Sequence, residues 1–493
     1  MRQNILSEEK YNRMITTPVS RLVSSLAVPT IISMLITSVY NMADTYFVSR
    51  ISTSASGAVG ISFALMAVIQ ALGFTFGAGA GNYISRLLGQ KDREHVSKVA
   101  ATSFFTALGL GAVLALLGLL FLDPLVYALG ATDTIAPHAK NYMRYILIGM
   151  PYMIASFVLN LTLRFQGSAY FAMLGIGAGG VLNVILDPIF IFKLRMGTGG
   201  AALATIISQF ISFCILYFNC GFGGNIRIRV RNFTPKWEIY KEILRGGLPS
   251  FNRQALASIA MISLNQVAGP FGDAAIAAMS IVSRTFQFAI AVILGFGQGF
   301  QPVCGFNYGA KRYDRVQEAF WFCFKTSFIL MVIAGALMFN FSTQVISFFR
   351  KEDLEVVAIG SRALRFQSVI FPLSAWIIMI NMTLQTIGKG TQAAILSISR
   401  HGLFFLPVIF TLPHFWGITG LQVCQPVADI FTFLVALLLG ISMLKELKAG
   451  QRLQEEGLEP GFKQKELDEE LELDSGQEER EKDPELKECV KGV

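Results

Sequence analysis

The sequence contains two stretches that decide the fold, GAGAGNYISRLLGQK (residues 77–91) and GQGFQPVCGFNYGAK (residues 297–311). Lys311 lies 220 positions after Lys91, and the same shift places three glycines of the first stretch on three of the second. Residues outside the two stretches follow the same register: Pro29 matches Pro249, Gly197 matches Gly417 and Gly200 matches Gly420. Farther along, Asn160 matches Asn381 after a slip of one residue, which a single insertion explains. The repeat predicts a chain built from two copies of one unit.

The composition indicates that the bilayer is the solvent of this chain. Of its 493 residues 53% are hydrophobic and only 15% are charged, and the mean hydropathy is +0.53. Such values exclude an ordinary soluble enzyme. The net charge of +8 does not indicate nucleic-acid binding, because the Lys and Arg residues lie in short segments between apolar runs.

Apolar segments long enough to cross the membrane, about 20 residues of helix each, come in two sets of six. The first set is expected at residues 26–48, 57–84, 96–121, 142–163, 171–192 and 200–218. The second set is expected at residues 247–268, 274–300, 319–341, 366–385, 393–412 and 418–444. We therefore predict an all-α integral membrane protein with about twelve transmembrane helices. An even number of helices per unit makes the two repeats parallel, so they form two lobes related by an axis along the membrane normal.

The basic residues predict the orientation of the chain. Lys and Arg gather in alternate loops, around residues 86–98, 227–245 and 311–315, whereas the other loops hold few or offset them with acidic residues. Loops rich in Lys and Arg remain in the cytoplasm. We expect a multi-pass protein of the inner (plasma) membrane with both termini cytoplasmic.

These observations divide the chain into five parts. We expect a cytoplasmic N-terminal segment (1–24), a first lobe with six helices (25–222), a basic cytoplasmic linker (223–246), a second lobe with six helices (247–447) and a charged tail (448–493). The tail holds almost no large apolar residues and is predicted to be disordered.

Acidic residues inside apolar helices are costly and mark functional sites. In the first lobe Asp44 and Asp187 lie at similar depths, with Asn183 one turn before Asp187 and with Asn41 and Thr205 nearby. Two carboxylates in a low dielectric either share a proton or, with the neighbouring amide and hydroxyl oxygens, bind Na⁺. Both ions remain alternatives, and a hydrogen-bond network that only holds helices together is the structural alternative.

Two prolines are expected to bend the helices that carry these carboxylates. Pro29 removes a backbone hydrogen bond in the first helix, and Pro188 frees a carbonyl beside Asp187. We hypothesise that protonation of Asp44 or Asp187 bends the first helix and reshapes a substrate cavity.

The second lobe lacks the acidic pair, because the 220-residue shift places Leu264 on Asp44 and Pro407 on Asp187. It instead holds Asp429, with several intramembrane arginines as candidate partners: Arg253, Arg284 and Arg400. Asp429, Arg284 and Gln287 are predicted to form either a structural ion pair or part of a substrate cavity, the ion pair being favoured.

The sequence offers no basis for enzymatic activity or for a bound cofactor. The four His residues lack metal-ligand spacing, the six Cys residues show no paired spacing, and no segment fits the phosphate loop of an ATP-driven pump. We expect a protein that is not an enzyme, holds no metal beyond a Na⁺ at Asp44, Asn183, Asp187 and Thr205, and needs no cofactor besides its coupling ion.

The segment NMADTYFV (residues 41–48), together with Pro29 and the paired GQK and GAK turns, resembles the multidrug and toxic compound extrusion (MATE) family. The likeness extends over residues 21–447, and GLPS (247–250) and QPVCGFNYGAK (301–311) are similar to its bacterial drug exporters. The resemblance implies a V-shaped helical fold, antiport of cationic and aromatic drugs against H⁺ or Na⁺, and a cation-coupling cluster of Asp44, Asn183, Asp187 and Thr205.

Two other functions stay open at this stage. A flippase of lipid-linked glycans shares the architecture but usually needs a cationic cavity, and a membrane protein without transport activity is the remote alternative. Small drugs and membrane lipids are the expected partners, and the protein is expected to be a monomer.

Overall fold

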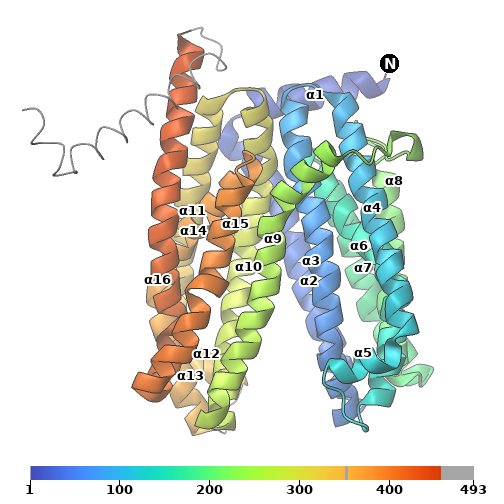
Figure 1. The fold of residues 1–493 in the computed structure, drawn as a ribbon, viewed down its shortest axis with the longest axis vertical. Helices are drawn as coiled ribbons and strands as arrows, with labels where there is room; N and C mark the ends of the chain where they lie inside the picture. The colour runs from blue at the N-terminus through green and yellow to red at the C-terminus, as the bar shows by residue number, and fades with distance from the viewer. Residues whose placement is uncertain (1, 350–352, 457–493) are drawn as a thin grey trace, which may run out of the picture.

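The computed structural model describes residues 2–349 and 353–456, and in these residues the chain is helical apart from short turns and an irregular segment at residues 220–236, with no strand. The helices form two lobes that lie side by side and diverge toward one end (Figure 1). This architecture confirms the predicted all-α fold with two lobes.

The first lobe contains six long helices, which follow the short N-terminal helix α1 (Arg2–Thr16). The six are α2 (Val19–Ser49), α3 (Thr53–Gly89), α4 (Arg93–Leu120), α6 (Ala136–Phe165), α7 (Ala169–Pro188) and α8 (Gly197–Asn219). A short helix α5 (Leu122–Ala128) links α4 to α6, and a π-helical turn η1 (Ile189–Lys193) extends α7.

The second lobe repeats this layout with more interruptions. It contains α9 (Trp237–Ala268), α10 (Asp273–Gly309), α11 (Tyr313–Asn340), α12 (Ser342–Phe349), α13 (Leu354–Ile370), α14 (Leu373–Thr386), α15 (Gly390–Ile398) and α16 (Phe405–Glu455). Two short turns complete it, η3 (Gly269–Phe271) and the π-helical η4 (Ser399–Leu403), while the turn η2 (Val230–Asn232) lies between α8 and α9 and contacts α4.

Within the described residues, nine helices are long and apolar enough to cross a membrane, and a tenth span arises if α13 and α14, bent by 57°, count as one. One of the nine, Gly390–Glu455, comprises 66 residues and turns at Gly417, where φ is 57°. At 1.5 Å per residue it is about three times as long as the ~30 Å hydrocarbon core is thick, so it crosses twice. Counting Gly390–Glu455 twice and the α13–α14 pair once gives eleven crossings, and α9, whose 32 residues are enough to span the bilayer, would be the twelfth.

Small residues allow the helices of the first lobe to approach closely. A Cβ at Gly73 would lie 2.6 Å from Phe157 Cβ, and one at Gly77 would lie 2.7 Å from Leu161 Cδ1. Both glycines are on α3 and face α6. These spaced glycines therefore serve helix packing, and no strand accompanies them in the described residues.

The two lobes meet along a seam in the half of the helices that is nearest both termini. A Cβ at Gly79 would lie 2.0 Å from the Ile243 carbonyl oxygen, and one at Gly309 would lie 2.0 Å from the Arg86 carbonyl oxygen. At the other end, helix faces are exposed: Met42 on α2 is 67% accessible and Ile262 on α9 is 58% accessible. The seam thus closes the molecule at the end that holds the termini (Figure 1).

Each lobe contributes the beginning of its first helix to the core of the other. Ile239 and Ile243 of α9 belong to the core of the first lobe, and Leu22 and Val23 of α2 pack with Phe300 of α10 in the second. Residues 237–246, expected in the linker, are therefore helical, because their apolar side chains are buried against α3. The exchange ties the two lobes together at the seam.

The tail also begins later than expected. Helix α16 continues to Glu455 because its last turns pack on α11: Gln317 Nε2 donates to Gln451 Oε1 (3.0 Å), and Gly450 faces the ring of Tyr313. The remainder of the predicted disordered tail, residues 457–493, lies outside the described residues.

Candidate functional site

Helices α2 and α7 approach closely at Gly180, and this contact positions the acidic residues of the first lobe. A Cβ at Gly180 would lie 2.7 Å from Ile36 Cγ2 and 3.4 Å from Tyr40 Cδ1. Asp44 lies one turn after Tyr40 on α2, and Asp187 lies two turns after Gly180 on α7. The two carboxylates therefore lie within electrostatic range of each other.

Four predicted residues form one buried cluster. Asp187 is 0%, Asn183 3%, Thr205 6% and Asp44 8% accessible. Asn183 Nδ2 donates to Asp187 Oδ1 (3.2 Å) and weakly to Thr205 Oγ1 (3.4 Å), while Thr205 Oγ1 donates to the Ala201 carbonyl (3.0 Å). The structure thus brings together residues of α2, α7 and α8, as the sequence predicted.

The cluster has more oxygen acceptors than donors. Asp44 Oδ1, Asp187 Oδ2 and Asn183 Oδ1 are buried and have no hydrogen-bond partner. Among the described residues, neither carboxylate has a Lys, Arg or His nitrogen within 4 Å. Buried carboxylates without a positive partner are costly. The oxygen set fits a hard cation such as Na⁺, or protons on the carboxylates.

Two tyrosines that sequence reasoning missed lie beside the carboxylates. Tyr142 on α6 is 3% accessible and lies within electrostatic range of both Asp44 and Asp187, and Tyr40 on α2 lies within range of Asp44. Tyr40 precedes Asp44 by four residues and so shares its helix face, a signal that was available in the sequence. Tyr142 gave no such signal, because its helix is adjacent only in the folded chain.

Of the residues predicted to support the cluster, Pro188 and Asn41 lie near the carboxylates and Pro29 does not. Pro188 ends α7 directly after Asp187, and the π-helical turn η1 begins at the next residue. Helix α2 runs through Pro29 without a break, and Ser33 Oγ donates to the Pro29 carbonyl (2.8 Å). Fifteen residues of helix, roughly 22 Å, separate Pro29 from Asp44, so Pro29 lies near the seam. Asn41 lies half-buried one turn before Asp44.

In the second lobe the partner of Asp429 is Arg400. Arg400 Nε donates to Asp429 Oδ1 (2.9 Å) and Nη2 to Asp429 Oδ2 (3.3 Å). Gln425 Nε2 also donates to Asp429 Oδ1 (2.9 Å), and Asp429 is only 3% accessible. Arg284 is exposed and does not join the pair. The structure therefore supports the ion-pair interpretation of Asp429 and excludes Arg284 from it.

A cavity of about 400 Å³ lies beside this pair inside the second lobe, with Arg400 and Gln425 in its wall. Its lining is mostly apolar, with Met261, Leu264 and Phe286 among the side chains, and Gln287 lines it as well. Arg253 contributes a positive charge to the wall and has no carboxylate within 4 Å in the described part of the chain. The chamber can therefore hold an aromatic or aliphatic group beside one unpaired cation, since the Arg400 in its wall is paired with Asp429.

Comparison with known proteins gives a consistent result over both repeats. The MatE family model matches residues 29–189 and 249–411. Multidrug export protein MepA of Staphylococcus aureus (strain MSSA476) is 28% identical over 426 residues, which cover 86% of this chain and 94% of MepA.

Solved structures resemble the whole transmembrane part. A MOP superfamily transporter from Pyrococcus furiosus, for which reverse polarity of the binding pocket suggests a different function, has a TM-score of 0.83 and 30% identity, over 88% of this chain and 98% of that one. The outward-facing conformation of a multidrug resistance MATE family transporter gives a TM-score of 0.83 and 30% identity, over 89% and 98%.

Proposed function

Since this chain belongs to the MATE family of transporters, we propose that it exports small organic compounds, cationic and aromatic drugs among them, in exchange for H⁺ or Na⁺. The similarity to a multidrug export protein supports the substrate class. The observation that carries the exchange is the buried pair Asp44 and Asp187, whose oxygens lack donors.

The cluster couples an ion to a change of shape through the approach of α2 and α7. When both carboxylates are charged, they repel each other between α2 and α7; when a cation neutralises them, the repulsion disappears. The π-helical turn after Asp187 offers a place where α7 can adjust, since such turns lack the regular hydrogen-bond ladder. Occupancy of the site thus biases the first lobe toward one of two arrangements.

The position of the seam indicates to which side of the membrane the protein is open. If the termini are cytoplasmic, as the basic loops predict, the lobes are closed on the cytoplasmic side and separated on the outer side. The likeness to an outward-facing transporter supports this assignment. In this state, substrate leaves and the coupling cation enters the cluster.

The two lobes differ in the charges that their buried side chains present to a substrate. The buried carboxylates Asp44 and Asp187 of the first lobe favour positively charged compounds, whereas Arg253 disfavours them in the chamber of the second lobe. We expect that chamber to take neutral or anionic aromatic groups. Asp429 neutralises Arg400. The chamber therefore has less positive charge than a flippase for lipid-linked glycans would need. The exporter is therefore favoured.

The test uses the purified full chain in liposomes with an imposed pH or Na⁺ gradient and a fluorescent organic cation. The parent should transport the dye with one gradient, and Asp44→Asn and Asp187→Asn should lose most of the gradient-dependent rate, by a factor of roughly 10² for a lost proton-transfer or ion-binding group. Asp123→Asn is the matched control, because Asp123 is exposed and pairs with Lys140 (2.7 Å).

Two outcomes would count against the proposal. Equal rates for the parent and both cluster variants would exclude the carboxylates from coupling. Absence of transport by the parent with either gradient would exclude ion-driven export of organic cations.

A further inference from the structure

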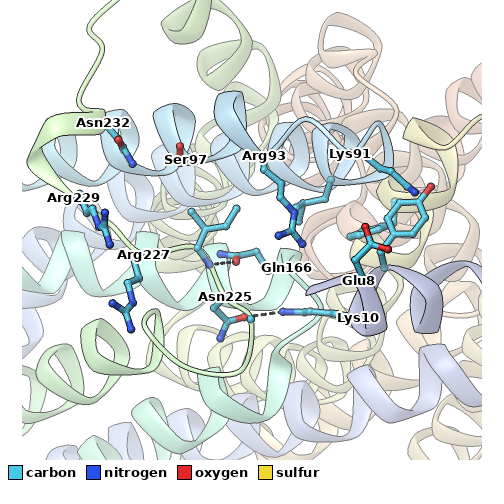
Figure 2. Close-up of a pocket in the computed structure, with 15 residues that line it drawn as sticks. Glu8, Lys10, Lys91, Arg93, Ser97, Gln166, Asn225, Arg227, Arg229 and Asn232 are labelled. Carbon is cyan, nitrogen blue, oxygen red and sulfur yellow. Dashed lines mark hydrogen bonds between the residues drawn. The ribbon is translucent and has the colours of Figure 1, made fainter. Parts of the chain in front are cut away.

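A second cavity, of about 540 Å³, lies at the end of the first lobe that carries α1. Figure 2 shows its walls, which come from α1, the start of α4 with the turn before it, the end of α6 and the segment that leads into η2. Five cationic side chains line it: Lys10, Lys91, Arg93, Arg227 and Arg229. Glu8 is the single carboxylate in the wall. The coupling cluster and the chamber of the second lobe share no residue with this cavity.

The positive charges of this cavity are not paired within the described residues. None of the five cations has a carboxylate oxygen within 4 Å. Lys10 Nζ donates to Ser168 Oγ and to Asn225 Oδ1, both at 2.7 Å and both neutral. Lys91 lies over the ring of Tyr11, 4.5 Å from its centroid. Five like charges around one hollow repel one another, and a bound anion would remove that repulsion.

The inner wall also holds a donor without an acceptor. Gln166, at the end of α6, is 2% accessible, and its Oε1 accepts the backbone N–H of Ile226 (2.8 Å). Its Nε2 is buried and has no partner. Buried donors are satisfied in nearly all proteins by protein, water or ligand. An unsatisfied hydrogen-bond donor in a cationic pocket indicates a binding site for an anion with several acceptor oxygens.

We propose that this cavity binds the phosphate group of an anionic phospholipid. Guanidinium groups match phosphate oxygens with two parallel hydrogen bonds, and lysines add point charges. Arg227 and Arg229 stand at one side of the hollow with Arg93 at its other side (Figure 2). The Gln166 amide supplies a neutral donor from the wall.

Apolar surface beside the arginines favours a lipid over a soluble phosphate. A neighbouring hollow of about 360 Å³ is lined by Arg227 and Arg229 together with Phe218 and Phe222. Phe218 is 66% and Phe222 62% accessible. A headgroup in the basic cavity would place its acyl chains against these phenyl rings. Basic pockets at membrane surfaces recognise lipid headgroups in this way.

The test compares the full chain with two variants in nanodiscs. Arg227→Gln/Arg229→Gln removes two cations of the cavity, and Arg231→Gln is the matched control from the same segment, exposed and outside both hollows. Native mass spectrometry counts retained phosphatidylglycerol, with phosphatidylcholine as reference. The double variant should bind phosphatidylglycerol on the order of twentyfold more weakly, from about a fivefold loss per basic residue, while the control and the parent agree.

Three further results decide the assignment. Equal retention of phosphatidylglycerol by the parent and the double variant would show that the cavity is not the binding site. Saturation by inorganic phosphate with no preference for phosphatidylglycerol would show that the ligand is not a lipid. Lipid binding that appears only when residues 457–493 are deleted would overturn the lipid assignment too, because the acidic tail would then be the occupant. Folding is checked by dye export, which the double variant should retain.

Discussion

Arg86 of α3 and Glu242 of α9 form an ion pair across the seam, with Arg86 Nη2 2.8 Å from Glu242 Oε2. Arg86 Nη1 also donates to the Thr386 carbonyl on α14 (3.0 Å), and its side chain is only 12% accessible. One side chain thus holds two helices of the second lobe to the first. These contacts must break when the seam opens.

Replacement of Arg86 by Gln should therefore shift the protein toward the state that is open at the termini. Partly buried charged hydrogen bonds contribute about 1.5–3 kcal/mol, which corresponds to a population change of roughly tenfold or more. Spin labels placed on α4 and α11 and measured by electron–electron double resonance would report the shift. Arg245→Gln is the control, since Arg245 is half-exposed and lies 3.8 Å from Glu242; an equal shift in both variants would contradict a specific role of Arg86.

Substitution of Gly79 by Ala should also loosen the seam, for a steric reason. The new Cβ would lie 2.0 Å from the Ile243 carbonyl oxygen and 3.0 Å from the Gly247 backbone nitrogen, and neither backbone atom can move alone. We expect a loss of about 1–3 kcal/mol from overpacking, measured by thermal unfolding in detergent. Gly109→Ala on α4 meets no atom within 4 Å and should leave the melting temperature unchanged or slightly higher.

The internal repeat made much of the fold predictable. The features that the repeat could not predict have physical reasons. Hydropathy located twelve spans because each apolar run must match the bilayer. The exchange of helix beginnings between lobes was not predictable, since Ile243 reads as the end of a basic linker until α3 is placed beside it. Likewise, Gly79 and Gly309 were recognised only as glycines of the repeat, because contacts between lobes depend on the assembled structure.

The ion pair of Asp429 and Arg400 should support stability without taking part in coupling. Asp429→Asn leaves the guanidinium buried without a counter-charge, which typically costs about 3–5 kcal/mol, so the melting temperature should fall. Asp429→Leu combined with Arg400→Met should recover most of the loss, because no charge stays unpaired. Loss of the gradient dependence of export in the well-folded double variant would show instead that the pair belongs to the coupling machinery.

The candidate site was predicted in part. Asp44, Asp187, Asn183 and Thr205 were found because polar residues in apolar helices are conspicuous and because depth follows from helix direction. The partner of Asp429 required the structure, as three arginines were equivalent in sequence. The phosphate cavity was missed because its cations read as orientation signals, and because α1 appeared to be only a polar terminus.

Lys10 makes a pH dependence of the phosphate cavity testable. Burial, followed by the charges of Arg13 and Arg93, lowers the pKa of Lys10 from 10.5 to about 7. Cys220 nearby stays neutral in this range, because burial raises the pKa of its thiol to about 12. The native state therefore binds fewer protons than the unfolded chain between pH 7 and 10.5, and stability without anion rises with pH in that window.

Anion binding should follow the opposite trend, because protonated Lys10 attracts phosphate. Phosphatidylglycerol should raise the melting temperature more at pH 6 than at pH 8, and titration should centre near pH 7. In Lys10→Met the cavity keeps its other four cations and loses the titrating one, so the lipid effect should be smaller and nearly equal at the two pH values. A pH dependence of the same size in Lys10→Met would show that Lys10 is not the titrating group.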